Sequence, residues 1–255
     1  NPGAVVNAGA DATICETGTY TLSGSTASNF SSLLWTTSGE GIFNNPAGLN
    51  PTYIPSASDI LNGSVVLTLT ATRIAPCGTI SDNMTLYISH QAIANAGPDA
   101  TLCEGSSFAV TAAAASYQTS ISWTHNGAGT ITGASTLTPV YTPGIGETGD
   151  VILTLSVTSA APCNPASDQM TLHIYALPAA FAGVDSTICE GSSYAILGST
   201  ASNYSSLTWS TSGTGTFNNA GVLHPVYAPS QSDVVNGFVF LVLNAYGNGP
   251  CPAAT

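Results

Sequence analysis

A cysteine flanked by carboxylates recurs three times in the chain, within the motif Asp-x-Thr-x-Cys-Glu. The thiols of the three copies are Cys15, Cys103 and Cys189. A second set adds one more cysteine to each copy: Cys77, Cys163 and Cys251. No CxxC pair or Cys/His spacing typical of a zinc site accompanies them. Two cysteines per repeat predict a disulfide framework and an oxidising compartment.

Three states of these cysteines remain open. One is a disulfide within each repeat, such as Cys15 with Cys77. In a seven-strand sandwich these two would lie at opposite ends, because Cys15 precedes the second strand, Cys77 follows the sixth, and those strands run parallel. Disulfide Cα atoms must lie within about 7 Å, whereas a strand spans about 17–20 Å. The second state links repeats stacked end to end, Cys15 with Cys163 and Cys103 with Cys251, and leaves the other two cysteines for neighbouring subunits. The third state is free thiols.

The carboxylates around the motif are candidates for calcium binding, since calcium takes several oxygen ligands. They are Asp11, Glu16, Asp99, Glu104, Asp185 and Glu190. They do not form the dense run of alternating Asp that a calcium loop has, so turn and cap chemistry at the surface is the competing interpretation. Other acidic residues also correspond between repeats, namely Asp59, Asp150 and Asp233. No cofactor other than this candidate calcium is predicted.

No pattern predicts an active site. The four histidines occupy different positions in the repeats, which argues against a shared metal or catalytic role: His90, His125, His173 and His224. The chain has no HExxH, GxSxG or glycine-rich phosphate loop. We therefore assign no catalytic residue and predict that the protein is not an enzyme.

The core residues of the fold that holds these motifs also recur along the sequence. Tryptophan recurs at Trp35, Trp123 and Trp209, with the same spacings of 88 and 86 residues as the first cysteines. Three copies of one small domain explain this self-similarity better than a single mixed fold. We predict domains at residues 1–90, 91–176 and 177–255.

Each repeat contains short alternating apolar runs bounded by turn residues, and no run has helical periodicity. The strongest alternating runs are 65–71, 151–157 and 239–245. The tryptophan lies on the third strand and is expected to face the core. We predict an all-β fold of three tandem Ig-like antiparallel β-sandwich domains, with Greek-key connections and about seven strands each.

The third repeat is expected to lack its last strand. The first two repeats continue past the second cysteine into the runs 84–88 and 170–174, whereas the third ends at Thr255. The second cysteine of the first repeat, Cys77, lies 26 residues before the first cysteine of the next, Cys103. If a new copy of the chain followed Thr255, the corresponding distance from Cys251 would be only 4 plus 15, or 19 residues. The difference of 7 residues is about one strand. Either the chain is a shortened part of a longer one, or another chain fills the open edge by strand complementation.

The charge balance excludes several classes of partner. Arg73 is the single basic residue, against 13 acidic ones. Nucleic-acid binding and attachment to anionic lipid both depend on cations, so neither is expected. No apolar run reaches the roughly 18 residues of a membrane span, so no membrane insertion is expected. With 44% hydrophobic and 5% charged residues the chain should fold. No signal peptide is visible.

These motifs carry a resemblance to a known group of domains. Asn-Ala-Gly-x-Asp-x-Thr-x-Cys-Glu, the tryptophan strand, Asn-Pro-Thr-Tyr, and Pro-Cys before Asp-x-Met-Thr-Leu resemble the Ig-like/PKD-like repeats of secreted cell-surface proteins of Bacteroidota. The resemblance covers all 255 residues. It implies a stalk, adhesin or surface fibre and no catalytic residue.

Attached sugar is a further candidate modification. Four asparagines lie in Asn-x-Ser/Thr sequons: Asn29, Asn62, Asn83 and Asn203. Ser186 lies in an Asp-Ser-Thr triplet similar to the short O-glycosylation motif of the same bacterial group. Chance occurrence in a chain rich in Ser, Thr and Asn is the competing interpretation.

The sequence therefore predicts a structural segment of an extracellular stalk or filament, built from end-to-end domains joined by disulfides or strand exchange. Its expected partners are copies of itself or flanking domains of the same array. The alternative is a cell-surface adhesin or carbohydrate-binding module, with glycans as partners and Tyr117 and Tyr246 as weak candidate contacts. A third interpretation is a passive spacer in a larger secreted protein.

Overall fold

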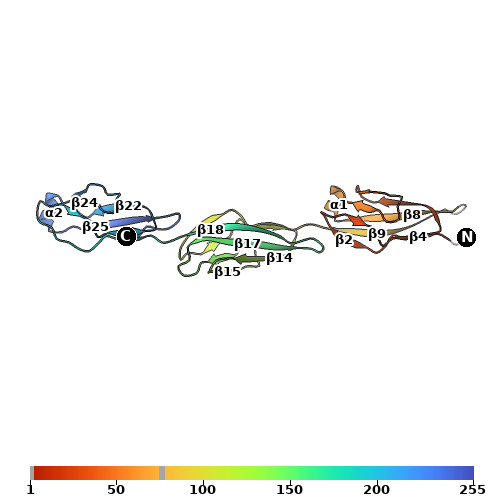
Figure 1. Cartoon of the computed structure of the whole chain (residues 1–255), viewed down its shortest axis with the longest axis horizontal. Coiled ribbons are helices and arrows are strands. Elements are labelled where there is room, and N and C mark those ends of the chain that lie inside the picture. Colours follow the sequence, from red (N-terminus) through yellow and green to blue (C-terminus); the bar gives the residue numbers. More distant parts are fainter. Residues whose placement is uncertain (1–2, 75–77) are drawn as a thin grey trace.

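The structure, a computed structural model, describes residues 3–74 and 78–255. Figure 1 shows three groups of strands in a row, with the N-terminus at one end of the array. We call the groups the first, second and third units; their strands lie within residues 5–89, 93–175 and 179–247. Each unit encloses its own cluster of buried apolar side chains. The predictions made for Cys77 lie outside the described residues.

The first unit contains nine short strands and one helical turn among its described residues. They are β1 (Val5–Asn7), β2 (Ala12–Cys15), β3 (Tyr20–Thr21), β4 (Thr26–Ser28), β5 (Phe30–Thr37), β6 (Ile42–Phe43), β7 (Thr52–Ile54), α1 (Ala57–Asn62), β8 (Ser64–Arg73) and β9 (Thr79–Ser89). The main sheet has the order β2-β9-β8-β5, and β3-β7-β6 forms the facing sheet. β2 runs parallel to β9, whereas the other neighbours in both sheets are antiparallel.

The second unit repeats this arrangement. Its strands are β10 (Ile93–Asn95), β11 (Ala100–Cys103), β12 (Phe108–Ala109), β13 (Ala114–Ser116), β14 (Gln118–His125), β15 (Thr130–Thr132), β16 (Val140–Thr142), β17 (Gly149–Ser159) and β18 (Ala166–Tyr175). The sheet order is β11-β18-β17-β14, with β12-β16-β15 facing it. The two units therefore share one topology.

The third unit forms a smaller set of strands. They are β19 (Ala179–Phe181), β20 (Tyr194–Ala195), β21 (Thr200–Ser202), β22 (Tyr204–Thr211), β23 (Thr216–Phe217), β24 (Val226–Ala228) and β25 (Leu241–Gly247), with α2 (Gln231–Asn236) before β25. Its main sheet contains only β22 and β25 in the described structure, while β20-β24-β23 faces it. The unit thus lacks the last strand, as expected from the repeat period.

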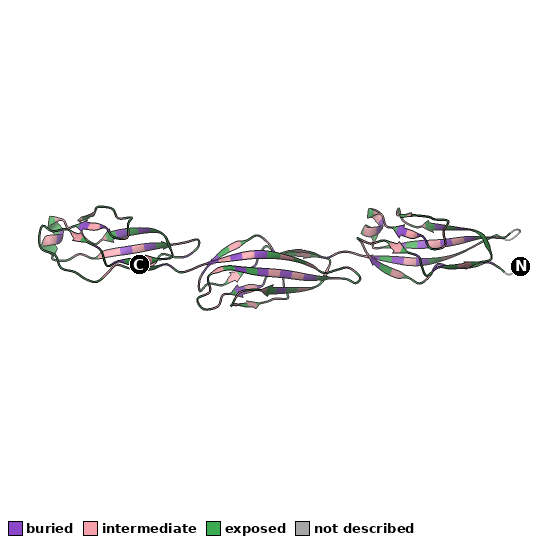
Figure 2. Cartoon of the chain, viewed as in Figure 1, coloured by how far each residue is buried: buried purple, intermediate pink, exposed green. Residues whose placement is uncertain are grey.

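Alternation of apolar and polar residues explains which side chains form the cores. Along β8, every second residue from Val65 to Ala71 is buried, and β17 alternates in the same way. Figure 2 shows this as buried and exposed bands along the long strands. Side chains of successive strand residues point to opposite faces, so one face fills the core and the other meets solvent. The tryptophans predicted for the core are buried: Trp35, Trp123 and Trp209.

The all-β Ig-like fold class predicted from sequence is confirmed, with two corrections to the elements. The first two units have nine strands rather than about seven in the described structure, because edge segments such as β1 and β2 pair with different sheets. In addition, α1 and α2 are helical turns of six residues each, which are too short to show helical periodicity.

Candidate functional site: the junctions between units

Each junction between neighbouring units is crossed by a disulfide. Cys15, the last residue of β2, bonds to Cys163 of the second unit with 4.9 Å between Cα atoms. Cys103, at the end of β11, bonds to Cys251 of the third unit with a Cα separation of 5.0 Å. Both separations lie in the usual range. The structure therefore has the pairing between stacked repeats, not a pairing within a repeat, for these four cysteines. Cys189, at the equivalent position of the third unit, is an exposed free thiol.

The first junction is reinforced by the linker residues His90 and Gln91. The Nδ1 atom of His90 lies 2.8 Å from Oε2 of Glu16 in the first unit, and the backbone N–H of Gln91 donates to Oε1 of the same carboxylate at 3.0 Å. On its other side the His90 ring stacks on Tyr117 of the second unit, with 4.4 Å between centroids. His90 thus connects a carboxylate of one unit to an aromatic ring of the next.

Gln91 extends the same connection into the second unit. Its side-chain Nε2 donates to the carbonyl oxygen of Asn164 and, at 3.4 Å, to Oγ of Ser159. The backbone N–H of Ala92 also donates to Ser159 Oγ, at 2.9 Å. These bonds lie beside the disulfide, so the linker and the bridge hold the two units at adjacent points.

The Glu16 carboxylate is electrostatically adapted to this place. The hydrogen bond with His90 and the one from the Gln91 backbone lower the pKa of Glu16, although burial opposes the effect. A lowered pKa means that the folded junction favours the ionised carboxylate. The negative charge of Glu16 therefore stabilises the junction. Both of its carboxylate oxygens already have protein partners, His90 and the backbone N–H of Gln91.

The second junction uses fewer polar side chains. The backbone N–H of Leu177 donates to Oε2 of Glu104 at 3.2 Å, as Gln91 does to Glu16 at the first junction. Tyr175 packs against Gly249 of the third unit so closely that a Cβ there would lie 2.4 Å from the ring. Ala176 stands where the first junction has His90. The second junction thus depends on its disulfide and on this close aromatic contact.

Two of the other calcium candidates, Asp11 and Asp99, form hydrogen bonds within the protein. Asp11 Oδ1 accepts the backbone N–H of Thr85 at 2.7 Å, and Asp99 Oδ1 accepts that of Thr171 at 2.7 Å. Both bonds tie the start of the second strand of a unit, β2 or β11, to its last strand, β9 or β18. In the described parts of the chain, no three His, Cys, Asp or Glu residues are grouped as a metal site would require. Asp185 and Glu190 lie on either side of Cys189 in an exposed segment of the third unit.

A tyrosine–carboxylate pair inside each unit was missed by sequence reasoning. Tyr53 donates its hydroxyl to Asp59 Oδ2 at 2.7 Å, and Tyr227 donates to Asp233 at 2.8 Å. The second-unit equivalent is Glu147 beside Tyr141, not Asp150 as the sequence correspondence suggested. Asp150 instead pairs with His173 on the surface. A carboxylate six residues after the buried tyrosine is the signal that identifies these pairs.

These carboxylates close a turn of each sandwich. Asp59 also accepts the backbone N–H groups of Glu40, Gly41 and Ser56 at 2.9–3.1 Å. Burial by itself raises the pKa of Asp59, but these hydrogen bonds outweigh it and the pKa is lowered. Burial raises the pKa of Tyr53 to about 12. The pair is structural, because it satisfies buried donors and lies away from any open site.

The candidate glycosylation residues lie at or near the surface. Asn29 and Asn203 adopt left-handed backbone conformations with φ of 56° and 55°, and their side-chain Nδ2 atoms donate to the carbonyl oxygens of Gly3 and Leu177. Asn62 ends α1, and Asn83 lies on the outer face of β9. Ser186 lies on an exposed segment. All five remain candidates for modification.

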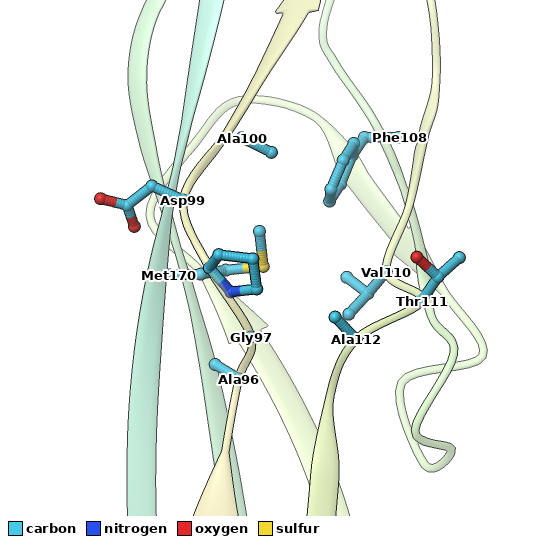
Figure 3. A pocket seen from close by; sticks show the side chains of 10 residues that line it. Ala96, Gly97, Asp99, Ala100, Phe108, Val110, Thr111, Ala112 and Met170 are labelled. Atoms are coloured by element: carbon cyan, nitrogen blue, oxygen red, sulfur yellow. The ribbon is translucent and has the colours of Figure 1, made fainter.

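The described chain has two notable hollows, and neither is an enclosed pocket. The larger, of about 470 Å³, lies open at the surface of the third unit and is lined by Ser212, Gly213, Asn236 and residues 238–240. The smaller hollow, in the second unit, has a volume of about 90 Å³. It lies between the Ala96–Ala100 segment and Phe108 and Val110, with Met170 beside it (Figure 3). Its lining is mainly apolar, and Asp99 points away from it. Ligand pockets usually enclose about 300–1,000 Å³. This hollow is therefore a packing defect rather than a binding site.

Comparison with known proteins identifies the architecture. No protein-family model and no curated protein sequence matches the chain. Among solved structures, a three-Ig fragment of titin in an E-to-A mutated variant aligns with a TM-score of 0.52 and 10% sequence identity, over 99% of this chain and 95% of that one. An I-band fragment from titin aligns with a TM-score of 0.52 and 9% identity, over 99% and 96%. Among the described residues, no helix has the length and apolar character of a membrane span. The chain has the fold of tandem Ig-like domains.

Proposed function

We propose that the chain is a structural segment of an extracellular stalk or filament, in which each unit is one Ig-like domain with the boundaries 1–90, 91–176 and 177–255. The observation that supports this function is the pair of disulfides that cross successive junctions, Cys15–Cys163 and Cys103–Cys251. Disulfides persist mainly in oxidising compartments, which supports a location outside the cell. The partners are flanking domains or further copies in the same array.

A covalent bridge at each junction changes how the array responds to bending. Domains joined by a single linker move relative to each other unless their interface is large and apolar. The disulfide gives each junction a second covalent connection, which restricts bending to rotation about the line joining the two. The bonds of Gln91 and the Tyr175–Gly249 contact oppose that remaining rotation. A stiff rod is useful in a stalk, which must hold its tip away from a surface.

Electron microscopy of single molecules tests the proposal. In the oxidised chain we expect extended rods with a narrow distribution of angles between units. A variant with Ser at the four bridging cysteines should fold its domains and show a broad distribution. A variant with Ser only at Cys189 is the matched control and should match the parent. Equal angle distributions with and without the bridges would contradict the stalk mechanism. In native material, long uniform fibres with an axial repeat of about three domains would support the filament form.

A further inference from the structure

The two bridges differ in how far solvent reaches them. In the second bridge, Cys103 and Cys251 are buried, with 5% and 9% of their surfaces exposed. In the first bridge, Cys15 and Cys163 are only partly buried. A reductant must bring a thiolate against one sulfur of a disulfide, so the rate of thiol–disulfide exchange depends on access. The first bridge is therefore more open to attack than the second.

The residue beside each bridge explains this difference. Tyr175 pairs with Cys103 in the β11–β18 ladder, and its ring packs against Gly249, two residues before the other cysteine of the second bridge. Ser89 pairs with Cys15 at the same position of the β2–β9 ladder. A tyrosine ring thus shields the second bridge, whereas a small hydroxyl side chain lies beside the first.

The side-chain contacts between units are distributed in the opposite way. At the first junction His90 contacts the carboxylate of Glu16 on one side and the ring of Tyr117 on the other. At the second junction, the positions of His90 and Tyr117 are occupied by Ala176 and Asn203. The more accessible bridge is therefore the one that has additional side-chain contacts beside it.

The backbone of Tyr117 indicates that its ring is held in place for this contact. Tyr117 has a left-handed conformation with φ of 57°. Its equivalents, Asn29 and Asn203, belong to a residue type that tolerates this conformation, and their side chains donate to nearby carbonyl oxygens. A bulky residue is strained there because its Cβ crowds the following carbonyl. The stack on His90 is the contact that this strained conformation makes possible.

We propose that the chain responds to reduction in two stages, and that Glu16, His90 and Tyr117 form a latch. A dithiol reduces the first bridge first, and the latch keeps the first junction aligned while that bridge is open. The second bridge is reduced later, and the second junction then becomes the hinge of the chain. In each step the dithiol gives two electrons and two protons to the bridge; the bridge becomes two thiols and the dithiol becomes a disulfide.

This inference rests on the proposed stalk function and specifies under which condition, and at which junction, the stalk bends. The first junction has two independent means of alignment, a bridge and a latch. The second junction has a shielded bridge and few other polar side-chain contacts, so its alignment depends on that bridge remaining closed.

Timed reduction of the oxidised chain tests the order of the two stages. A background with Ser at Cys77 and Cys189 retains only the four bridging cysteines. It is exposed to dithiothreitol, quenched with an alkylating reagent at intervals, and mapped by mass spectrometry. The first bridge should be alkylated at least about tenfold faster than the second, because exchange depends on access. Equal rates, or faster reduction of the second bridge, would overturn the proposal.

A tyrosine variant tests the origin of this order in the same assay. Tyr175→Ser gives the second bridge the neighbour that the first bridge has, so the rates of the two bridges should become nearly equal. Tyr87→Ser is the matched control, since Tyr87 is an exposed tyrosine of β9, and it should leave both rates unchanged. A second bridge that stays slow in Tyr175→Ser would contradict shielding by this ring.

Single-molecule electron microscopy tests the latch. Opening only the first bridge, by Cys15→Ser with Cys163→Ser, should leave the angle distribution at the first junction narrow. Adding His90→Ala and Tyr117→Asn should broaden it. Both are the residues that the second junction has at these positions, and Asn suits the left-handed conformation, so the units should still fold. A first junction that broadens while the latch is intact would overturn the latch.

The outcomes separate this inference from the stalk proposal. Opening only the second bridge should broaden the second junction. If it does, but the two bridges are reduced at equal rates or the first junction also needs its bridge, the inference fails and the stalk function stands. If neither junction changes when its bridge is removed, the stalk mechanism itself fails.

Discussion

The two disulfides give the chain a covalent short cut that a pulling experiment can measure. Force applied to the two ends crosses from Cys15 to Cys163, returns along the chain to Cys103 and crosses to Cys251. This path contains 14 residues before Cys15, the 60 that separate Cys103 from Cys163, and 4 after Cys251, or about 78 of the 255 residues. At about 3.3–3.6 Å per residue its full extension is about 260–280 Å, against about 840–920 Å for the reduced chain.

Optical-trap or atomic-force measurements on a chain with Ser at Cys77 and Cys189 would show this difference directly. Only residues between Cys103 and Cys163 can then unravel under oxidising conditions, so one limited lengthening of the second unit is expected. Adding a reductant should release the full length. Removing either bridge alone leaves a path of about 106 residues, so the two bridge-deleted variants should have the same limit of about 350–380 Å.

The competing pairing within repeats has a different signature in this background. Only Cys103 and Cys163 could then pair within one repeat. The path would bypass the 60 residues between them and leave about 194 residues extensible, about 640–700 Å. An oxidised limit near that value, or one equal to the reduced chain, would refute the reasoning.

Three further predictions concern the units and their surfaces. Because the pKa of Tyr53 is raised to about 12, its neutral form stabilises the fold fully below pH about 10, and this stabilisation is lost as the pH rises from about 10 to 12. The pKa of Asp59 is lowered, so its carboxylate stabilises the fold above pH about 4, and this stabilisation is lost as the pH falls. Asp59→Asn should lower the free energy of unfolding of the first unit by about 1–3 kcal/mol in denaturant titrations and flatten its acid dependence; an unchanged acid limb would contradict this. Gly249→Ala places a Cβ against the Tyr175 ring and should broaden the angle distribution at the second junction only, whereas Gly198→Ala, which meets no atom within 4 Å, should not. Intact-mass measurement of native material should exceed the polypeptide mass if the sequons carry sugar, and a mass equal to the polypeptide would exclude it.

The sequence predicts those features that depend on repetition and strand direction. The spacing of the tryptophans and the alternating runs indicate tandem Ig-like sandwiches, since a repeated core residue needs a repeated core. Cys15 and Cys77 are expected at opposite ends of a sandwich, and strand length exceeds disulfide reach, so a bridge to the next repeat is favoured. Period counting likewise indicates that the third unit lacks a strand.

The details of the junctions do not follow from repetition. His90 and Gln91 have no counterparts at the second junction, where Ala176 and Leu177 take their places, so comparison of repeats gives no reason to single them out. Only the folded chain brings His90 against Tyr117. His90 and Gln91 contribute to the junction through contacts between residues far apart in the sequence, and the spacing of residues along the chain does not predict such contacts.

The short helices are a different case, because a local signal was present. Ser56 caps α1 by accepting from Asp59, and the Asp59 side chain accepts from the Ser56 backbone. Ser230 and Asp233 do the same for α2. This reciprocal arrangement resembles a capping box, which Ser followed three residues later by an acidic residue indicates in sequence. Six residues are too few for hydrophobic periodicity, so capping chemistry is the signal to use for such turns.

Mapping the disulfides of the oxidised chain tests the central claim most directly. Cleavage after Asp and Glu places each cysteine in a separate peptide, so every bridge appears as one linked pair in mass spectrometry without reduction. The account predicts a Cys15–Cys163 pair and a Cys103–Cys251 pair. A Cys15–Cys77 pair would contradict it, because the junctions would then have no covalent bridge.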